Sequence, residues 1–287
     1  MARRRPPRGE PAGPDRSPPC LAAQYGPWAL VAGAAQGIGE AFATHLARAG
    51  LHLVLVDRSP DPLEDLCRRL SEAHGVVTQP VILDLAAPDA ADALARATAD
   101  LDLGLVVYNA AHSPIGRILD LPVSDLLRVV DVNVRTPLLL AHVFGRAMVA
   151  RGRGGIVLMS SLSALQGSAY VATYAASKAF TWVLGEGLWE ELRDQGVDVV
   201  TCVAGPTRTP GWLSSSPAET GWPRPPVMSP DDVASAALGA LGQSPSVIPG
   251  TFNRMTAFVM ARLLPREVAI RIFGRTLDRM YGGRPPR

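Results

Sequence analysis

Short apolar runs alternate with helix-forming segments along most of this chain of 287 residues. The runs are continuously hydrophobic, which is typical of parallel strands covered on both faces, and their alternation with helices is typical of a doubly wound α/β sheet. The sequence therefore predicts a seven-stranded parallel sheet with helices on both sides. The expected strands are 28–33, 51–57, 76–83, 103–109, 154–160, 197–203 and 245–248, and the expected helices are 37–49, 61–74, 88–99, 123–150, 169–194 and 229–241.

Bulk composition narrows the classes of function. Hydrophobic residues make up 47% of the chain and charged residues 19%, as in a globular protein with a sizeable core. A net charge of +2 gives no argument for nucleic-acid binding, and no apolar run approaches the ~20 residues of a membrane span. Cys20, Cys67 and Cys202 are odd in number and form no CxxC pair, so we expect a reducing, cytoplasmic location and no metal site.

The two ends of the chain differ from the folded domain that we expect at 28–250. Residues 1–27 are rich in proline, arginine and glycine and lack the apolar stretch of a secretory signal, so we expect a disordered tail. Within the domain, the segment 210–230 interrupts the strand–helix alternation with several prolines and two tryptophans, which favours a long functional loop.

The C-terminal extension, 251–287, is expected to form two helices separated by Pro265. Arginines at positions i, i+4 and i+8 form a basic stripe, and apolar residues fall on another face. A basic amphipathic helix of this kind suits an anionic membrane surface or a partner, can cover a substrate pocket, or packs as a terminal helix with its arginines in solvent. The stripe is Arg271, Arg275 and Arg279, and the apolar residues are Ile270, Phe273 and Leu277.

A glycine-rich turn, Gly33-Ala34-Ala35-Gln36-Gly37-Ile38-Gly39, follows the first expected strand and opens the next helix. Glycines let the backbone approach a pyrophosphate closely, and the helix N-terminus offers it free N–H groups and a positive dipole end. The spacing is GxxxGxG, not the GxGxxG of the usual dinucleotide fingerprint. The turn predicts a dinucleotide site. The alternative is that the glycines serve only the packing of a strand–helix turn.

An acid and a base stand together at the end of the second expected strand. Asp57 is placed to bind the ribose diol of NAD and to repel a 2′-phosphate. Arg58 follows immediately and is placed to hold that phosphate, as in an NADP site. Neither Ala35 nor Gln36 adds positive charge, so the sequence favours NAD but leaves NADP open.

Lys178 is the only lysine among 28 basic residues, and it lies four residues after Tyr174. On a helix, positions i and i+4 share a face, so both groups would point into one site. A phenol that must exchange a proton near neutral pH needs a close point charge to lower its pKa from about 10. The pair therefore indicates acid–base chemistry, whereas a chance surface lysine is the alternative.

Together these motifs resemble the short-chain dehydrogenase/reductase family, oxidoreductases with a Rossmann-like sheet. The family's YxxxK matches Tyr174 and Lys178, and its serine lies 13 residues before the tyrosine, as Ser161 does. Its helix-borne asparagine matches Asn133. The set is more specific than YxxxK alone, and the resemblance implies catalytic roles for all four residues.

The resemblance also implies NAD or NADP as cofactor. The family's acidic position beside the adenine matches Asp84, and its NNAG motif appears as Tyr108-Asn109-Ala110-Ala111, with tyrosine and alanine at its ends. Its PG motif is altered to Ala204-Gly205. The implied cofactor-binding residues are Gly33, Gln36, Gly37, Ile38, Gly39, Asp57, Arg58, Asp84, Leu85, Asn109, Ala110, Tyr174, Lys178, Gly205, Thr207 and Thr209.

By resemblance, Tyr174 exchanges a proton with the substrate oxygen, and Lys178 lowers the tyrosine pKa and holds the nicotinamide ribose. Ser161 would bind the same substrate oxygen, and Asn133 would anchor a water that joins Lys178 to solvent. The expected reaction interconverts a hydrophobic secondary alcohol and its ketone. A cofactor-binding redox sensor or scaffold without turnover is the alternative.

The resemblance further implies a homodimer or homotetramer that assembles through the long helices 123–150 and 169–194. On the substrate side it implies an apolar lining, which suits an apolar ketone or alcohol. The residues expected there are Leu162, Leu165, Tyr170, Trp212 and Leu213.

Overall fold

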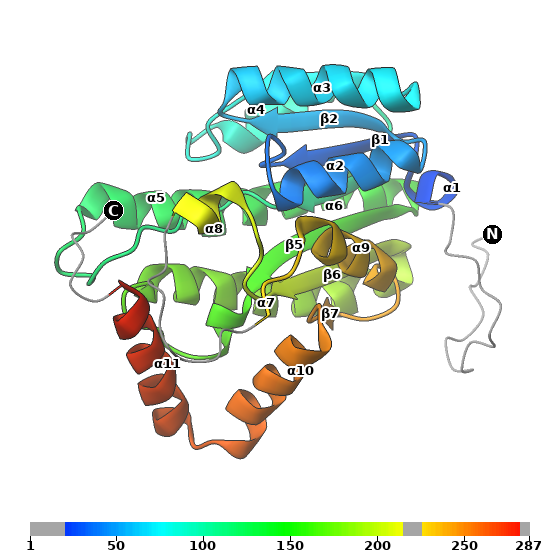
Figure 1. The fold of residues 1–287 in the computed structure, drawn as a ribbon. Coiled ribbons are helices and arrows are strands. Elements are labelled where there is room, and N and C mark those ends of the chain that lie inside the picture. Colours follow the sequence, from blue (N-terminus) through cyan, green and yellow to red (C-terminus); the bar gives the residue numbers. More distant parts are fainter. Residues whose placement is uncertain (1–20, 215–225, 282–287) are drawn as a thin grey trace.

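The structure is a computed structural model that describes residues 21–214 and 226–281. Within them, seven parallel strands form one sheet in the order β3-β2-β1-β4-β5-β6-β7 (Figure 1). The order reverses between β1 and β4, and α/β sheets bind ligands in the crevice at such a switch point. The predicted fold class is confirmed. The strands are β1 (Trp28–Ala32), β2 (His52–Asp57), β3 (Thr78–Ile82), β4 (Leu103–Tyr108), β5 (Gly154–Ser161), β6 (Val197–Ala204) and β7 (Ser246–Val247).

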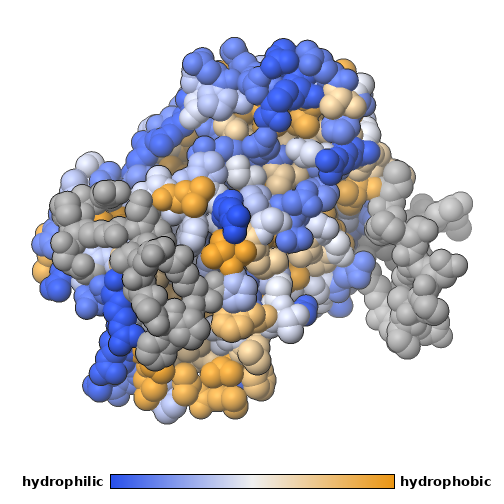
Figure 2. Space-filling model, viewed as in Figure 1, coloured by the Kyte–Doolittle hydropathy of each residue, from blue (hydrophilic) through white to orange (hydrophobic). Residues whose placement is uncertain are grey.

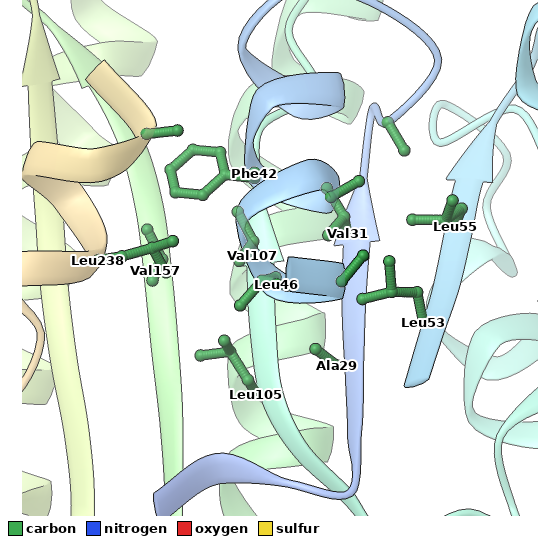
Figure 3. Packing of buried hydrophobic residues seen from close by; sticks show 14 of the residues in the cluster. Ala29, Val31, Phe42, Leu46, Leu53, Leu55, Leu105, Val107, Val157 and Leu238 are labelled. Carbon is green, nitrogen blue, oxygen red and sulfur yellow. The ribbon is translucent and has the colours of Figure 1, made fainter. Parts of the chain in front are cut away.

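Helices cover both faces of the sheet, which explains the continuously apolar strands. On one face Phe42 and Leu46 of α2 and Leu238 of α9 pack over strand residues such as Val31 and Val107 (Figure 3). No helix in the described part of the chain is long and apolar enough to cross a membrane. The first face carries α2 (Ile38–Arg48), α3 (Pro60–His74) and α9 (Pro230–Ala240), and the second carries α4 (Ala90–Ala97), α6 (Thr136–Arg151) and α7 (Ala172–Leu192).

The helix expected at 123–150 is interrupted. Helix α5 (Val123–Val130) runs into a π-helical turn (Asp131–Arg135) before α6 begins. A π turn takes up one extra residue and often marks a functional position. Here it turns Asn133 into the protein interior, where its side chain is only 1% exposed.

The helix expected at 169–194 begins later than predicted, at Ala172. Tyr170 has a φ of 63°, in the left-handed region that does not continue a right-handed helix. The short stretch before α7 is therefore a fixed, non-helical approach to Tyr174.

The N-terminal part of the domain begins earlier than expected. Residues 21–27, predicted to be disordered, include α1 (Leu21–Tyr25) and the buried Tyr25 ring. The Tyr25 hydroxyl and Gln24 Nε2 donate to the buried carboxylate of Asp198 over 2.9 and 2.8 Å. Burying a carboxylate is unfavourable without such partners, so this contact anchors the segment. The other twenty residues of the expected tail lie outside the described part.

The C-terminal extension is a helical hairpin that packs on the domain (Figure 1). Helix α10 (Thr251–Phe258) continues through a π-helical turn (Val259–Leu263) into α11 (Arg266–Tyr281) after a short bend. Ala257 packs against the end of β6, and Leu277 packs against the segment before α7. The hairpin therefore forms part of the folded core.

Candidate active site

A cavity of about 730 Å³ lies at the carboxyl ends of the strands. Its walls include the residues that follow β1, β2, β4, β5 and β6, which the parallel topology brings to one edge of the sheet. Every catalytic or cofactor-binding residue predicted from the sequence lines this cavity, except Gly39 and Asn133.

The glycine turn has the geometry that a pyrophosphate site requires. Gly33 has a φ of 78°, and a Cβ there would lie 2.7 Å from the backbone of Ala110. Gly39 lies behind the cavity wall and has a packing role. A Cβ there would lie 1.9 Å from the carbonyl oxygen of Gly33, so the absence of a side chain lets the start of α2 pack against the turn. Gln36, Gly37 and the first residue of α2 line the cavity, so the helix N-terminus opens into it.

Asn109 holds the turn in place from the neighbouring strand. Its Nδ2 donates to the carbonyl oxygen of Gly33 over 2.8 Å, and its backbone N–H donates to that of Ala32 over 3.0 Å. The asparagine of the altered NNAG motif therefore fixes the loop that would receive the cofactor, despite the changes at Tyr108 and Ala111.

Asp57 and Arg58 differ in their contacts with the rest of the protein. The two oxygens of Asp57 accept the backbone N–H groups of Ala35 and Ser59, over 3.1 and 3.2 Å. Arg58 is exposed at the cavity edge and makes no hydrogen bond or ion pair with any residue in the described part of the chain.

Asp84 is held by a base that the sequence did not single out. Both of its oxygens accept from Arg128 Nη2 over 2.8 Å, and Oδ1 also accepts the Ala86 N–H. Burial raises the pKa of Asp84, but the amide and the guanidinium outweigh it, so the pKa lies below its usual value. Leu85 is buried beside it and gives this end of the cavity an apolar surface.

The loop after β6 closes the cavity opposite the glycine turn. Thr207 pairs with Met228, and its hydroxyl donates to the carbonyl oxygen of Gly205 over 3.0 Å. The hydroxyl of Thr209 accepts the N–H of Trp212, which starts the short helix α8 (Pro210–Ser214). Both threonines line the cavity and are fixed by their own loop.

Tyr174, Lys178 and Ser161 meet in the middle of the cavity, as the sequence predicted. The Lys178 Nζ lies 5.7 Å from the centre of the Tyr174 ring and donates to the carbonyl oxygen of Met159 over 2.8 Å. Burial lowers the pKa of Lys178 to about 8. Burial also raises the pKa of Tyr174, and a hydrogen bond with Ser161 offsets only part of that rise.

The expected lowering of the tyrosine pKa by Lys178 is therefore absent from this arrangement. The ammonium faces the ring and a backbone carbonyl, and the direction of the Tyr174 pKa shift is set by burial, which the hydrogen bond with Ser161 only partly offsets. A lower tyrosine pKa would require a change in the solvation or the contacts of these two side chains.

Asn133 lies behind the wall of the cavity. Its carboxamide accepts the N–H of His112 over 2.8 Å and donates to the carbonyl oxygen of the same residue over 2.9 Å. Its Nδ2 also donates to Ser177 Oγ over 3.0 Å. These contacts engage both ends of the side chain inside the protein, so it joins the loop at His112 to α7. The expected role of Asn133 in anchoring a water beside Lys178 stays a prediction.

The substrate side of the cavity is built largely by residues that the sequence did not predict. Leu162 and Trp212 line it, but Leu165, Tyr170 and Leu213 do not. Residues of the hairpin line this side instead. The apolar residues at helical spacing in the C-terminal extension were the only feature of the sequence that pointed to this lining. The lining residues from the hairpin are Phe252, Asn253, Thr256, Phe273, Thr276, Leu277, Arg279, Met280 and Tyr281.

Comparisons with known proteins agree with this geometry. Residues 27–220 match the model of the short chain dehydrogenase family. A 7beta-hydroxysteroid dehydrogenase of Collinsella aerofaciens is 34% identical over 239 residues, which are 82% of this chain and 90% of that protein.

Solved structures extend the likeness to three dimensions. A 7beta-hydroxysteroid dehydrogenase structure has a TM-score of 0.82 and 32% identity, over 88% of this chain and 98% of that one. A short-chain dehydrogenase from Sphingobium yanoikuyae, solved with NADPH, has a TM-score of 0.71 and 29% identity, over 83% and 94%. The chain therefore belongs to the short-chain dehydrogenase family and is an NAD(P)-dependent oxidoreductase that interconverts alcohols and ketones.

Proposed function

We propose that the enzyme interconverts a bulky, hydrophobic secondary alcohol of hydroxysteroid size and its ketone. The observation that carries this proposal is the packing of Tyr174 against the apolar cluster of Val171, Leu277 and Tyr281. The proton-exchanging phenol is thus bordered by a large apolar wall, which suits a rigid hydrophobic skeleton. The 7beta-hydroxysteroid dehydrogenase relatives support this size class.

The bound nicotinamide supplies or accepts the hydride. In this proposal Tyr174 gives a proton to the ketone oxygen in reduction and takes it from the hydroxyl in oxidation. Ser161, already hydrogen-bonded with Tyr174, binds the same oxygen and stabilises the charge that develops on it. Lys178 holds the ribose hydroxyls, and Asn133 positions the His112 loop and α7 around them.

A Tyr174→Phe variant tests the role of the phenol. We expect turnover of a hydroxysteroid panel to be abolished while NAD(P)H fluorescence still reports cofactor binding, because only the proton-exchanging hydroxyl is removed. Ser161→Ala should lower kcat by about 10²-fold or more. Ser163→Ala is the matched control and should stay active, because Ser163 contacts Ser161 through its backbone N–H. Full activity of Tyr174→Phe would refute the assignment.

We infer that the preferred cofactor is NADP(H). The sequence favoured NAD because of Asp57, but both oxygens of that carboxylate already accept backbone amides. Arg58 is exposed at the cavity edge, where its planar guanidinium suits a phosphate. The NADPH complex of the Sphingobium relative supports this choice.

The cofactor preference has a direct test. Arg58→Gln should raise the KM for NADPH by roughly tenfold or more and leave the KM for NADH nearly unchanged, because only NADPH carries the 2′-phosphate. Equal changes for both cofactors would exclude a phosphate contact. If the unaltered enzyme prefers NADH, Asp57 decides the specificity instead, and Asp57→Asn should then weaken NADH binding.

We also propose that the outer face of the hairpin contacts an anionic lipid surface. Met255, Phe258 and Leu263 are 58%, 58% and 62% exposed, and an apolar area covers the far end of the hairpin in Figure 2. Arginines on the same helices supply the complementary charge. They are Arg254, Arg262, Arg266, Arg271 and Arg275.

Vesicle sedimentation tests the lipid contact. The protein should bind vesicles that contain phosphatidylserine and not pure phosphatidylcholine, and added salt should weaken binding. Met255→Ser with Phe258→Ser should abolish it. Val77→Ser with Ile82→Ser removes comparably exposed side chains at the edge strand and should not. Binding that the first pair leaves intact would refute the proposal.

A further inference from the structure

The hairpin contributes an almost fully buried polar side chain to the cavity, that of Asn253 on α10, which is 3% exposed. Its Nδ2 donates to the carbonyl oxygen of Pro249 over 2.9 Å and to the sulfur of Met228 over 3.4 Å. Both N–H groups of the carboxamide are therefore used inside the protein. Its Oδ1 accepts no hydrogen bond from any residue in the described part of the chain, although an unpaired buried acceptor is unfavourable.

The carboxamide lies against the loop after β6. A Cβ at Gly205 would lie 2.5 Å from Nδ2, 2.7 Å from Cγ and 2.7 Å from Oδ1 of Asn253, so only glycine leaves room for the group. This close approach and the two contacts of Nδ2 together fix the orientation of the side chain. Since Asn253 lines the cavity, Oδ1 is the polar atom that remains to meet a ligand there.

A second polar group lies one turn further along α10. Thr256 also lines the cavity, and its hydroxyl makes no hydrogen bond with a residue that the structure describes. Residues three apart on a helix share a face, with Cβ atoms about 5–6 Å apart, so one ligand atom can reach both side chains. An amide oxygen only accepts, whereas a threonine hydroxyl can also donate. The pair therefore suits a ligand hydroxyl, which donates to Asn253 and accepts from Thr256.

The same helix stands next to the serine of the acid–base group. Ala257, which follows Thr256, packs with Leu162 and Val203 in one apolar cluster. Leu162 directly follows Ser161, the residue that binds the reacting oxygen in the proposed function. The polar pair on α10 therefore lies on the substrate side of the cavity, within an otherwise largely apolar lining.

We infer that Asn253 and Thr256 bind a second hydroxyl of the substrate, distinct from the hydroxyl or ketone that reacts. The preferred substrate is then a polycyclic diol or hydroxyketone. A site built to pair with a substrate hydroxyl rejects the analogue that lacks it, because the buried polar groups of the site are left unpaired. The inference rests on the proposed function, because it names a chemical group of that same substrate class.

Steroids that share the oxidised hydroxyl and differ in the ring position of a second hydroxyl test this inference. Each diol is compared by kcat/KM with the analogue that carries hydrogen at the second position. The unaltered enzyme should prefer one diol over its analogue by about tenfold or more. Asn253→Ala should remove that preference by slowing the diol alone. Thr256→Val, which keeps the shape of the side chain and every contact of Nδ2, should reduce the preference severalfold.

Met228→Leu is the matched control, because it removes the sulfur that Nδ2 contacts and leaves Oδ1 in place. It should retain the preference for the diol. If the unaltered enzyme prefers no diol, or if both variants on α10 keep the preference, the inference is overturned and the proposed function stands. If Asn253→Ala keeps the preference and instead weakens NADPH binding measured by fluorescence, the carboxamide holds the cofactor, and the inference is again overturned. Absence of turnover for every steroid would overturn both.

Discussion

Lys178 is an unusual lysine because the protein keeps its ammonium almost wholly out of solvent, at 4% exposure. Burial favours the neutral amine and lowers its pKa to about 8. Since the chain has no other lysine, protein labelled with ¹³Cε-lysine should give a single side-chain NMR signal. We expect that signal to titrate near pH 8 in the protein without cofactor. A midpoint near 10.5 would contradict the burial.

The same shift makes the free energy of unfolding depend on pH. Between about pH 8 and 10.5 the unfolded chain keeps the lysine proton and the folded protein loses it, so Lys178 makes stability rise with pH, by up to ~1.4 kcal/mol per unit. Burial raises the pKa values of Cys67 and Cys202, which act in the opposite direction. The test is therefore the difference between denaturation curves of the unaltered protein and Lys178→Met, and the rise should be missing from the variant.

Single residues could be predicted where their partners lie near in sequence. Tyr174 and Lys178 are four residues apart, so helical geometry alone brings them together. The two hydrogen bonds between Asn133 and the backbone of His112 were not predictable, because they depend on the π turn and on a loop 21 residues away. Arg279 lines the cavity only through a chain reversal that no local pattern specifies.

At the scale of elements, the apolar patterns predicted most helices and strands, and the errors fall where backbone geometry departs from regular periodicity. The π turn at Asp131–Arg135 preserves the apolar pattern of the expected helix, so the sequence looks continuous across it. Tyr170 adopts a left-handed conformation that its residue type does not indicate. Both irregularities adjoin the site, where local rules most often give way to tertiary contacts.

Helix α11 should be required for substrate binding and not for cofactor binding. It supplies an apolar wall of the substrate side, whereas every predicted cofactor residue precedes residue 250. A chain that ends after Leu264 should bind NADPH with nearly unchanged affinity, measured by fluorescence, but show a strongly raised KM for hydroxysteroids. Circular dichroism checks that the shortened chain is folded. A proportional loss of cofactor binding would contradict this division of roles.

For the whole molecule, strand–helix alternation was sufficient to predict a doubly wound sheet, because right-handed crossovers leave few arrangements for such a chain. The sequence did not predict that the domain begins before Trp28. The partners of Asp198 come from α1, more than 170 residues earlier, and nothing near Leu21–Tyr25 in sequence indicates that contact. Composition alone assigned those residues to the tail.

The family's usual assembly leads us to expect a homodimer or homotetramer through the segments 123–150 and 169–194, which include α5 and α7 packed side by side. Both helices expose large apolar side chains that a monomer would leave in water: Val123 and Leu127 on α5 are 69% and 58% exposed, and Val183 on α7 is 69% exposed. Val183→Arg should place a charge in that interface and reduce the mass measured by light scattering.

Val77→Arg is the control for this experiment, since Val77 is 53% exposed beside the edge strand β3 and away from both helices. We expect it to leave the assembly intact, because an added charge at a solvated edge meets no partner. If unaltered protein is monomeric at micromolar concentration, the apolar faces of α5 and α7 do not join copies of this chain, and the expected assembly is wrong. If both variants lower the mass equally, the interface lies elsewhere.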